Sequence, residues 1–268
     1  MPDVYAAIAH TPLEMQERLA KVLELRAADP QQGRMLDSYL GRIEFPPKAR
    51  VLEVGCGTGS VARKLARRPG VAETIGIDLS ELFLERAREL SSGIARLSFL
   101  KGDARSLPFK DASFDAVVFH TTLCHLPEPE TALEQAFRAL KSGGWLAVFD
   151  GDYSTASVGV GDFDPLQASV QEAMAALVHD RWLIRRLAKL AACAGFLNPR
   201  LDTYGYVESS EPGYMLTIIE RGADLLASSR SIGPEMAAAI KAEARRRAKT
   251  GEFFGQISYA SLVARKPR

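Results

Sequence analysis

The chain has 268 residues, of which 47% are hydrophobic and 25% are charged, a composition typical of a soluble globular protein with room for one large α/β domain. The formal net charge of +1 provides no overall field for nucleic acid or an anionic membrane, so neither is an expected partner. Three cysteines without CxxC spacing argue against disulfides and structural zinc, and no apolar run approaches the roughly 18 to 20 residues of a membrane span. We therefore expect a cytoplasmic, single-domain protein over residues 1–268, a monomer or homodimer, with no metal site.

Two amphipathic helices are predicted before the first strand, in an N-terminal segment of residues 1–45. Apolar side chains recur at helical spacing through residues 12–28 and 31–41. These helices either pack against the edge of the core or form a lid over a cofactor. In the second case, Tyr5 or Arg34 would touch the carboxylate of that cofactor.

Residues 50–59 indicate a buried strand that runs into a glycine-rich turn. The apolar side chains of its first half are those of a parallel strand covered on both faces. Gly55, Gly57 and Gly59 remove every Cβ from the turn, so backbone N–H groups can approach a ligand closely. Residues 60–68 are predicted to be helical, which points the positive end of a helix dipole at that ligand.

The residues around this turn favour one class of ligand. The dinucleotide fingerprint GxGxxG is absent because Ser60 follows Gly59 directly. Glu53, at the end of the strand, places a carboxylate where an ammonium group is better suited than a phosphate. S-adenosylmethionine carries such an ammonium group. A nicotinamide cofactor and a tight turn without any ligand remain as weaker interpretations.

Further strand ends follow in order along the chain. An apolar strand ends at Asp78, nineteen residues after Gly59, near the roughly 20-residue offset at which an acid reaches ribose hydroxyls. Another strand is predicted before Asp103. A fourth strand covers residues 114–119, and a double glycine leads into a fifth at residues 145–149. Ligands of open α/β sheets bind at the carboxyl ends of such strands.

These segments resemble, in order, the motifs of the class I S-adenosylmethionine-dependent methyltransferases, and are most similar to the small-molecule branch that methylates ubiquinone and menaquinone precursors. The detailed similarity spans residues 51–150. The matching segments are Glu53-Val54-Gly55-Cys56-Gly57-Thr58-Gly59, residues 74–80, residues 97–104, residues 107–109, residues 113–118 and residues 140–145. The resemblance implies an α/β, Rossmann-like fold: a seven-stranded, mainly parallel sheet with an antiparallel last strand, a helical N-terminal lid and a helical cap insertion.

The resemblance also implies a set of cofactor contacts for S-adenosyl-L-methionine. The residues that match are Glu53, Gly55, Cys56, Gly57, Gly59, Asp78, Leu79, Phe83, Gly102, Asp103, Ala104 and His120. In this interpretation Asp103 accepts from the adenine amine, the Ala104 N–H serves a ring nitrogen, and the His120 carbonyl meets the methionine ammonium. Two alternatives stay open: Asp103 as a helix or turn cap, and Phe83 as a core residue.

His125 is the candidate catalytic residue, since the resemblance puts it at the lip of the acceptor pocket. An imidazole can take a proton near neutral pH, but it can also brace a loop by hydrogen bonding. A base is not essential. Orientation alone can lower a barrier by on the order of 7 to 11 kcal/mol, whereas a general base adds about 10²- to 10⁴-fold.

The C-terminal part is predicted to complete the sheet and to shape the acceptor pocket. Residues 151–164, rich in Gly, Ser and Asp, suggest an irregular loop, and residues 180–194 suggest a helix. Residues 201–207 are expected to form the sixth strand. Apolar and polar side chains alternate over residues 253–264, which predicts a last, antiparallel strand at the edge of the sheet.

The segment between the last two strands is the candidate acceptor cap. It covers residues 208–250 and carries two helical patterns, at 213–227 and 234–248. It follows a cofactor-binding core of residues 46–207 and precedes a last-strand segment of residues 251–268. Aromatic side chains that either line the pocket or belong to the core are Trp182, Tyr204, Tyr206, Tyr214 and Phe254.

The sequence thus predicts an enzyme that transfers the methyl group of S-adenosylmethionine to a small-molecule acceptor by in-line displacement. Whether the nucleophile is oxygen, carbon or nitrogen stays open. Several acids either attract an amine or simply form turns: Asp150, Asp152, Asp162 and Asp164. The alternatives are a non-catalytic module that binds S-adenosylmethionine and a nicotinamide-dependent oxidoreductase.

Overall fold

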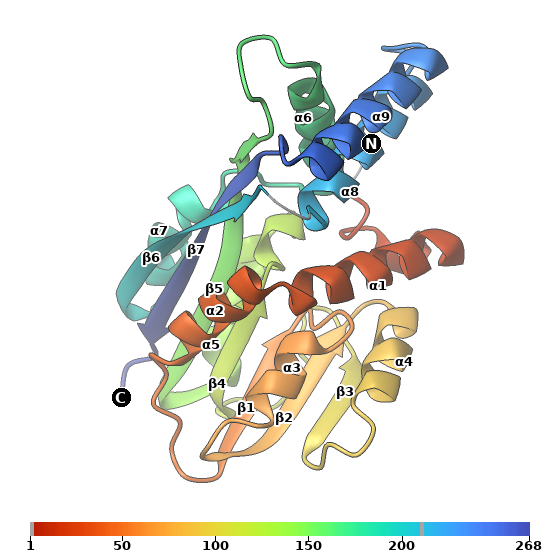
Figure 1. Ribbon diagram of the computed structural model, residues 1–268. Helices are drawn as coiled ribbons and strands as arrows, with labels where there is room; N and C mark the ends of the chain where they lie inside the picture. The colour runs from red at the N-terminus through yellow and green to blue at the C-terminus, as the bar shows by residue number, and fades with distance from the viewer. Residues whose placement is uncertain (1–2, 210–211) are drawn as a thin grey trace.

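The computed structural model describes residues 3–209 and 212–268 and contains one seven-stranded sheet of order β3-β2-β1-β4-β5-β7-β6 (Figure 1). The strands are β1 (Ala49–Val54), β2 (Val71–Asp78), β3 (Leu97–Lys101), β4 (Phe114–His120), β5 (Leu140–Ser157), β6 (Leu197–Glu208) and β7 (Gly255–Arg265). The pairs among β1 to β5 are parallel, and β7 runs antiparallel to both β5 and β6. The predicted fold class is confirmed.

The central strands β1 and β4 are buried along almost their whole length because helices cover both faces of the sheet. Their register pairs Glu53 with Val118 and Val54 with Phe119. This register brings the end of β1, with the glycine turn that follows it, next to the carboxyl end of β4. Both segments therefore reach the same edge of the sheet, where ligands of open α/β sheets bind.

The helices follow local start signals in the sequence. For example, Asp29 accepts hydrogen bonds from the Gln31 and Gln32 amides (2.7 and 3.0 Å), with Pro30 in the first turn. The α-helices are α1 (Leu13–Ala28), α2 (Pro30–Leu40), α3 (Ser60–Leu65), α4 (Glu81–Leu90), α5 (Pro129–Ala139), α6 (Pro165–Leu177), α7 (Leu187–Cys193), α8 (Tyr214–Ser228) and α9 (Pro234–Thr250). Single 3-10 turns are η1 (Ile8–His10), η2 (Leu123–His125) and η3 (Leu183–Arg185).

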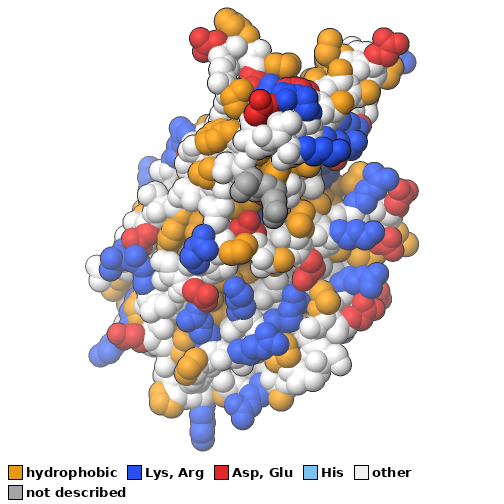
Figure 2. Space-filling view, viewed as in Figure 1, with side chains coloured by type: hydrophobic (Ala, Val, Ile, Leu, Met, Phe, Trp, Pro, Cys, Tyr) orange, Lys and Arg blue, Asp and Glu red, His pale blue; other side chains and the backbone are white. Residues whose placement is uncertain are grey.

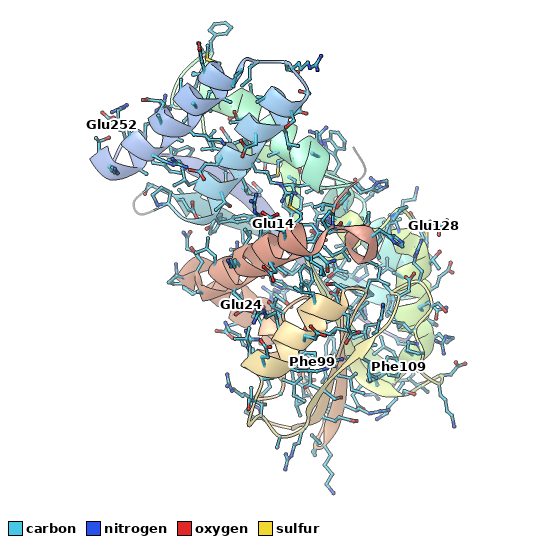
Figure 3. The ribbon with its side chains drawn as sticks, turned by 90° about the vertical axis from the view of Figure 1, so that its right-hand side faces the viewer. Glu14, Glu24, Phe99, Phe109, Glu128 and Glu252 are labelled. Carbon is cyan, nitrogen blue, oxygen red and sulfur yellow. The ribbon has the colours of Figure 1, made fainter. Side chains whose placement is uncertain are left out.

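Three helices, α6, α8 and α9, group beyond the carboxyl ends of the strands, and we call them the helical cap (Figure 1). Helix α1 runs between this cap and α4, as the side view of Figure 3 shows. Leu19 and Ala20 of α1 pack with Phe83 of α4, and Leu25 contacts Gly213 at the start of α8. The cap and α1 together cover the carboxyl edge of the sheet.

The prediction of an edge position for the last strand is wrong. β7 lies between β5 and β6, and β6 forms the edge. Gln256 and Ser258 give the first half of β7 an alternating pattern, but residues 259–264 are all buried. A strand with neighbours on both sides needs such a continuous buried run, and the alternation of its first residues misled the prediction.

Two further predictions of local structure are wrong. Residues 151–157 are not an irregular loop but the end of β5, because pairing of Gly151 and Asp152 with β7 overrides their low strand propensity. Residues 180–194 do not form one helix, since only η3 and α7 are helical there. Helix α6 was not predicted at all, although it packs against α8 in the cap.

Candidate cofactor and acceptor site

A cavity of about 390 Å³ lies at the carboxyl edge of the sheet, below the cap. The glycine turn, the ends of β2 and β4, and helices α1, α2, α6 and α8 all contribute to its lining. Of the predicted site residues, all but Gly59 line it. The turn, the acidic strand ends and the two histidines, which are far apart in the sequence, therefore belong to one cavity.

The glycine turn requires glycine for two reasons. Gly55, Gly57 and Gly59 have φ values of 71°, 53° and 79°, in the left-handed region that other residues avoid. A Cβ on Gly55 would also lie 2.3 Å from Cγ2 of Thr122, and one on Gly59 would lie 2.7 Å from Phe99 Cζ. Gly59 thus serves close packing of the turn rather than the cavity wall.

Glu53 is the strongest indication of a cationic ligand. Its side chain is buried, and its Oε2 has no hydrogen-bond partner among the residues that the structure describes. Burial, together with the charge of Asp78, raises the pKa of Glu53 well above its usual range. A buried carboxylate oxygen without a partner is costly, and an ammonium group beside it would remove that cost. This acceptor oxygen therefore fits the ammonium group at the methionine end of S-adenosylmethionine.

Asp78 and Asp103 lie at the ends of successive strands. Asp78 Oδ2 accepts from the Gly57 amide (2.8 Å) and Oδ1 from the Ser80 amide (2.9 Å), so this carboxylate also shapes the glycine turn. The Asp103 carboxylate accepts from the Arg105 guanidinium, with Nη2 to Oδ2 at 2.8 Å. This bond lowers the pKa of Asp103 and keeps it charged. Asp103 Oδ1 accepts two hydrogen bonds from Arg105, but Asp103 Oδ2 and both oxygens of Asp78 can each accept a further one, so both acids remain able to contact a ligand.

The remaining predicted cofactor residues form an apolar wall between these acids. Phe83 is buried in a cluster with Ile8 and Leu19 and lines the cavity, so it is both a core residue and a wall residue. Burial raises the pKa of the Cys56 thiol, which stays neutral. The other members that line the cavity are Leu79, Gly102 and Ala104.

His120 ends β4 and has a fixed, neutral ring. Its Nδ1 is hydrogen-bonded to the Tyr39 hydroxyl (2.9 Å), and the ring stacks on Phe149 with centroids 4.7 Å apart. Burial lowers the pKa of His120 well below its usual range, and the charges of Arg26 and Lys64 lower it further. The ring is therefore no proton acceptor near neutral pH, which leaves the backbone carbonyl as its contact group for a ligand.

His125 lies on η2 and is held by an acid from the N-terminal segment. Its Nδ1 lies 2.7 Å from Asp3 Oδ2, and its ring centroid lies 4.6 Å from that of Tyr5. Because a carboxylate can only accept, Nδ1 carries the proton and Nε2 is left as the basic nitrogen. This is the arrangement of a general base with an orienting carboxylate. Asp3 was missed by the sequence analysis, since no local pattern links residues this far apart.

Comparison with known proteins shows what the central part of the chain is similar to. A family model described as a methyltransferase domain matches residues 52–148. The chain is 34% identical over 151 residues to the 27-O-demethylrifamycin SV methyltransferase of Amycolatopsis mediterranei, covering 55% of this chain and 48% of that one. It is 35% identical over 117 residues to the ubiquinone/menaquinone biosynthesis C-methyltransferase UbiE of a Ruegeria species, covering 42% and 47%. Residues 52–148 therefore match a methyltransferase domain and are similar in sequence to S-adenosylmethionine-dependent methyltransferases of small molecules.

A solved structure extends the similarity beyond the matched domain. A Bacillus halodurans protein provisionally assigned as a methyltransferase superimposes with a TM-score of 0.64 at 24% identity, covering 88% of this chain and 100% of that one. The predicted family resemblance is confirmed, and S-adenosylmethionine is the cofactor of the family. The matches cover between 27% and 49% of the length of these curated relatives.

The half of this methyltransferase cavity that faces the cap contains charged and aromatic residues that the sequence analysis missed. Arg26 of α1 donates to Thr121 Oγ1 (2.6 Å), and its guanidinium lies 5.9 Å from the centre of the Tyr214 ring. Tyr153 of β5 and Arg221 of α8 also line the cavity. A helical pattern alone does not tell which face of α1 or α8 meets a ligand, so no signal in the sequence distinguishes these residues from surface ones.

Several predicted lining residues lie elsewhere. Tyr5 and Tyr214 line the cavity, whereas Arg34 is exposed on α2 and does not. The aromatic residues that do not line it are Trp182, Tyr204, Tyr206 and Phe254. Tyr206 instead donates to Glu208 (2.6 Å) on the edge strand.

The four acids considered as attractants for an amine do not line this cavity either. Asp150 is buried and accepts from the Cys124 amide, Asp152 pairs with Arg185, and Asp164 caps α6. The interpretation of Asp150, Asp152 and Asp164 as local structural residues is therefore favoured.

Two further findings concern the described part of the chain only. In residues 3–209 and 212–268, no group of three or more His, Cys, Asp or Glu side chains is arranged to hold a metal ion. No helix in these residues combines the length and the apolar character needed to cross a bilayer. Positive and negative side chains are interspersed on the face shown in Figure 2.

We expect Glu53→Gln to stabilise the cofactor-free methyltransferase at neutral pH and to weaken cofactor binding. The raised pKa means that the folded protein holds the Glu53 proton more tightly than the unfolded chain. Stability from this group is therefore present at low pH and is lost as pH rises from the unfolded pKa of about 4.3 through the folded value. Urea unfolding should show a larger advantage of the variant at pH 8 than at pH 5.

The same variant should bind S-adenosylmethionine more weakly by about 1.5 to 3 kcal/mol in calorimetry, the usual range for hydrogen bonds to a charged group. Glu73→Gln, which removes a carboxylate that is partly exposed on β2, is the control and should change neither property. A variant less stable than the parent at pH 8 would show that Glu53 is satisfied without a ligand.

Proposed function

We propose that this protein transfers the methyl group of S-adenosylmethionine to a small-molecule acceptor by in-line displacement. One observation carries the proposal: a single cavity joins Glu53, whose Oε2 has no hydrogen-bond partner among the described residues, to the His125–Asp3 pair. A cofactor held at one end and a nucleophile held at the other would then meet at the carboxyl ends of β1 and β4. The acceptor atom is oxygen, carbon or nitrogen.

The proposed cofactor contacts follow the cavity lining. Glu53 Oε2 and the His120 carbonyl take the ammonium, and Asp78 takes the ribose hydroxyls. Asp103 and the Ala104 N–H take the adenine edge, with the other predicted cofactor residues forming the wall. When bound, the cofactor supplies an electrophilic methyl group on a sulfonium, so the protein needs to orient the acceptor and exclude water.

The remaining roles belong to the acceptor side. His125 Nε2 takes the proton of the acceptor nucleophile, and Asp3 holds the ring in that tautomer and stabilises the imidazolium that forms.

Arg26 and Lys64 lie close enough to His120 to lower its pKa. They therefore provide positive charge for the cofactor carboxylate. Helix α1 and the cap close the cavity to solvent.

We further propose that residues 1–268 act as one methyltransferase domain, with residues 208–250 as part of the acceptor cap. The single sheet supports this view, because it combines strands of the cofactor-binding core with the last strand, β7. The interspersed surface charges and the net charge of +1 support an acceptor that is neither nucleic acid nor membrane. A cytoplasmic location and a monomeric or homodimeric state complete the proposal.

The test is a methyl-transfer assay with fractionated metabolites. The protein is incubated with S-adenosylmethionine labelled on the methyl group, and mass spectrometry follows labelled product and S-adenosylhomocysteine. We expect both to form in at least one fraction. Cofactor binding in calorimetry without any product would instead indicate a binding module, and preferential binding of NAD would indicate an oxidoreductase.

We expect Asp78→Ala to weaken S-adenosylmethionine binding by about 1.5 to 3 kcal/mol, because the ribose loses hydrogen bonds to a charged group. The loss has a second source, since Asp78 also accepts from the Gly57 amide and shapes the turn. Calorimetry measures it, with Asp37→Ala, an exposed acid on α2, as the control. Unchanged affinity in Asp78→Ala would reject the ribose assignment.

A further inference from the structure

Helix α8 presents one face to the acceptor half of the cavity. Tyr214, Thr217, Ile218 and Arg221 all line it, at the spacing i, i+3, i+4, i+7 of a single helical face. Arg221 is the basic residue of this face. Its position is thus set by the packing of the cap and not by a surface loop.

Arg221 has no fixed partner in the part of the chain that the structure describes. No described side chain forms a hydrogen bond or ion pair with its guanidinium. Two other cations of the same cavity are engaged, since Arg63 pairs with Glu24 (2.9 Å) and Arg26 donates to Thr121. The five N–H donors of Arg221 therefore remain available to a ligand.

Asp3 is the acid whose charge acts on Arg221, but its oxygens are already used. Oδ1 accepts from the Tyr5 amide (2.8 Å), and Oδ2 accepts from His125 Nδ1 (2.7 Å) and from the His179 amide (2.8 Å). The negative charge of Asp3 offsets part of the positive charge of Arg221, although the two side chains do not form an ion pair. It also links the surroundings of Arg221 to the proposed base.

Burial lowers the pKa of Arg221, which means that its charge has lost part of its hydration. A desolvated guanidinium without an ion-pair partner is unfavourable in the free protein, and an oxyanion that binds it recovers that cost. The hydroxyl-bearing rings of Tyr5 and Tyr214 lie in the same electrostatic neighbourhood. They offer further hydrogen bonds to such a group.

The walls on either side of this polar group are apolar. Met174 and Leu177 of α6, Val178 and Ile218 line the same cavity. An acceptor that fills this space would have an apolar body that contacts α6 and α8 and a charged head near Arg221. Because Asp3 contacts His125 and acts on Arg221, the head and the nucleophilic atom lie close together in the acceptor.

We propose that Arg221 is a specificity-determining residue that selects an organic acid as acceptor, by pairing its guanidinium with the carboxylate. This inference deepens the proposed function and rests on it. Bidentate pairing with a planar carboxylate is the geometry that a guanidinium serves best. Neutral analogues leave the guanidinium unpaired, and cationic ones repel it.

The test uses matched sets of three probes. Each set consists of a cyclic or open-chain hydroxy acid, its primary amide and its amine counterpart, and the sets increase in apolar size. Each probe is titrated by calorimetry into the protein with and without S-adenosylhomocysteine. We expect at least one acid to bind at least about tenfold more tightly than its amide, the lower end of the range for a hydrogen bond to a charged group. Arg221→Gln should reduce the affinity for that acid to the affinity for its amide.

Two variants complete the design. Arg221→Lys should show part of the preference for the acid that Arg221→Gln loses, because lysine is positively charged but lacks the planar N–H donors of a guanidinium. Arg245→Gln, on the exposed side of α9, is the control and should keep the full preference. Affinity for S-adenosylhomocysteine should be the same in all four proteins.

The proposal is overturned if no acid binds more tightly than its amide, if an amine binds more tightly than its acid, or if Arg221→Gln keeps the preference. Failure of the proposed function has a different signature. In that case S-adenosylhomocysteine does not bind, or no methylated product forms, whereas the titrations without cofactor still decide the role of Arg221.

Discussion

The His125→Asn variant is expected to transfer methyl groups about 10²- to 10⁴-fold more slowly than the parent protein, the usual contribution of a general base. Asparagine keeps a hydrogen bond to Asp3 but cannot take a proton. Single-turnover kinetics with a saturating acceptor measure the chemical step directly. Affinity for S-adenosylmethionine should stay nearly unchanged, because the base acts on the acceptor.

Asp3→Asn separates orientation from proton transfer. The Asp3 carboxylate fixes Nδ1–H of His125 and so leaves Nε2 basic. Its amide analogue should slow transfer, because the ring is then no longer held in the tautomer that leaves Nε2 basic. His10→Asn, an exposed residue of η1, is the matched control. Retention of the full rate in His125→Asn would leave orientation alone as the source of catalysis.

The Gly222→Ala variant is expected to lose about 3 kcal/mol of unfolding free energy, at the upper end of the usual cost of overpacking. A Cβ at this position of α8 would lie 1.7 Å from the Ser169 carbonyl oxygen of α6. That atom belongs to the backbone, so the two helices must separate. Helix propensity alone predicts the opposite sign, because alanine is favoured over glycine by roughly 0.8 to 1 kcal/mol.

Urea unfolding measures this change. Gly205→Ala on β6 is the control, because a Cβ there has no described atom within 4 Å. Separation of α6 and α8 would also displace Met174 and Arg221 from the cavity wall. Acceptor binding should therefore weaken more than cofactor binding. A Gly222→Ala protein as stable as the parent would show that the cap packs more loosely than the structure indicates.

Local sequence determined the cofactor half of this protein. The strand, turn and helix of residues 50–68 follow one another without a break, so hydrophobic pattern, glycine positions and Glu53 were enough to predict the turn and its ligand. Asp78 and Asp103 follow the same logic, since each ends a strand in a fixed chain order. Parallel strands bring their carboxyl ends to one edge, which is why these residues line one cavity.

Only the tertiary structure decided the acceptor half. The interior position of β7 depends on burial on both sides, which a pattern of alternation cannot reveal. The contact of His125 with Asp3 joins distant segments, and the role of Arg221 depends on which face of α8 the cap turns inward. Such contacts are set by the packing of whole helices and strands against one another. No short segment encodes them, because burial and pairing at each position depend on residues far away in the chain.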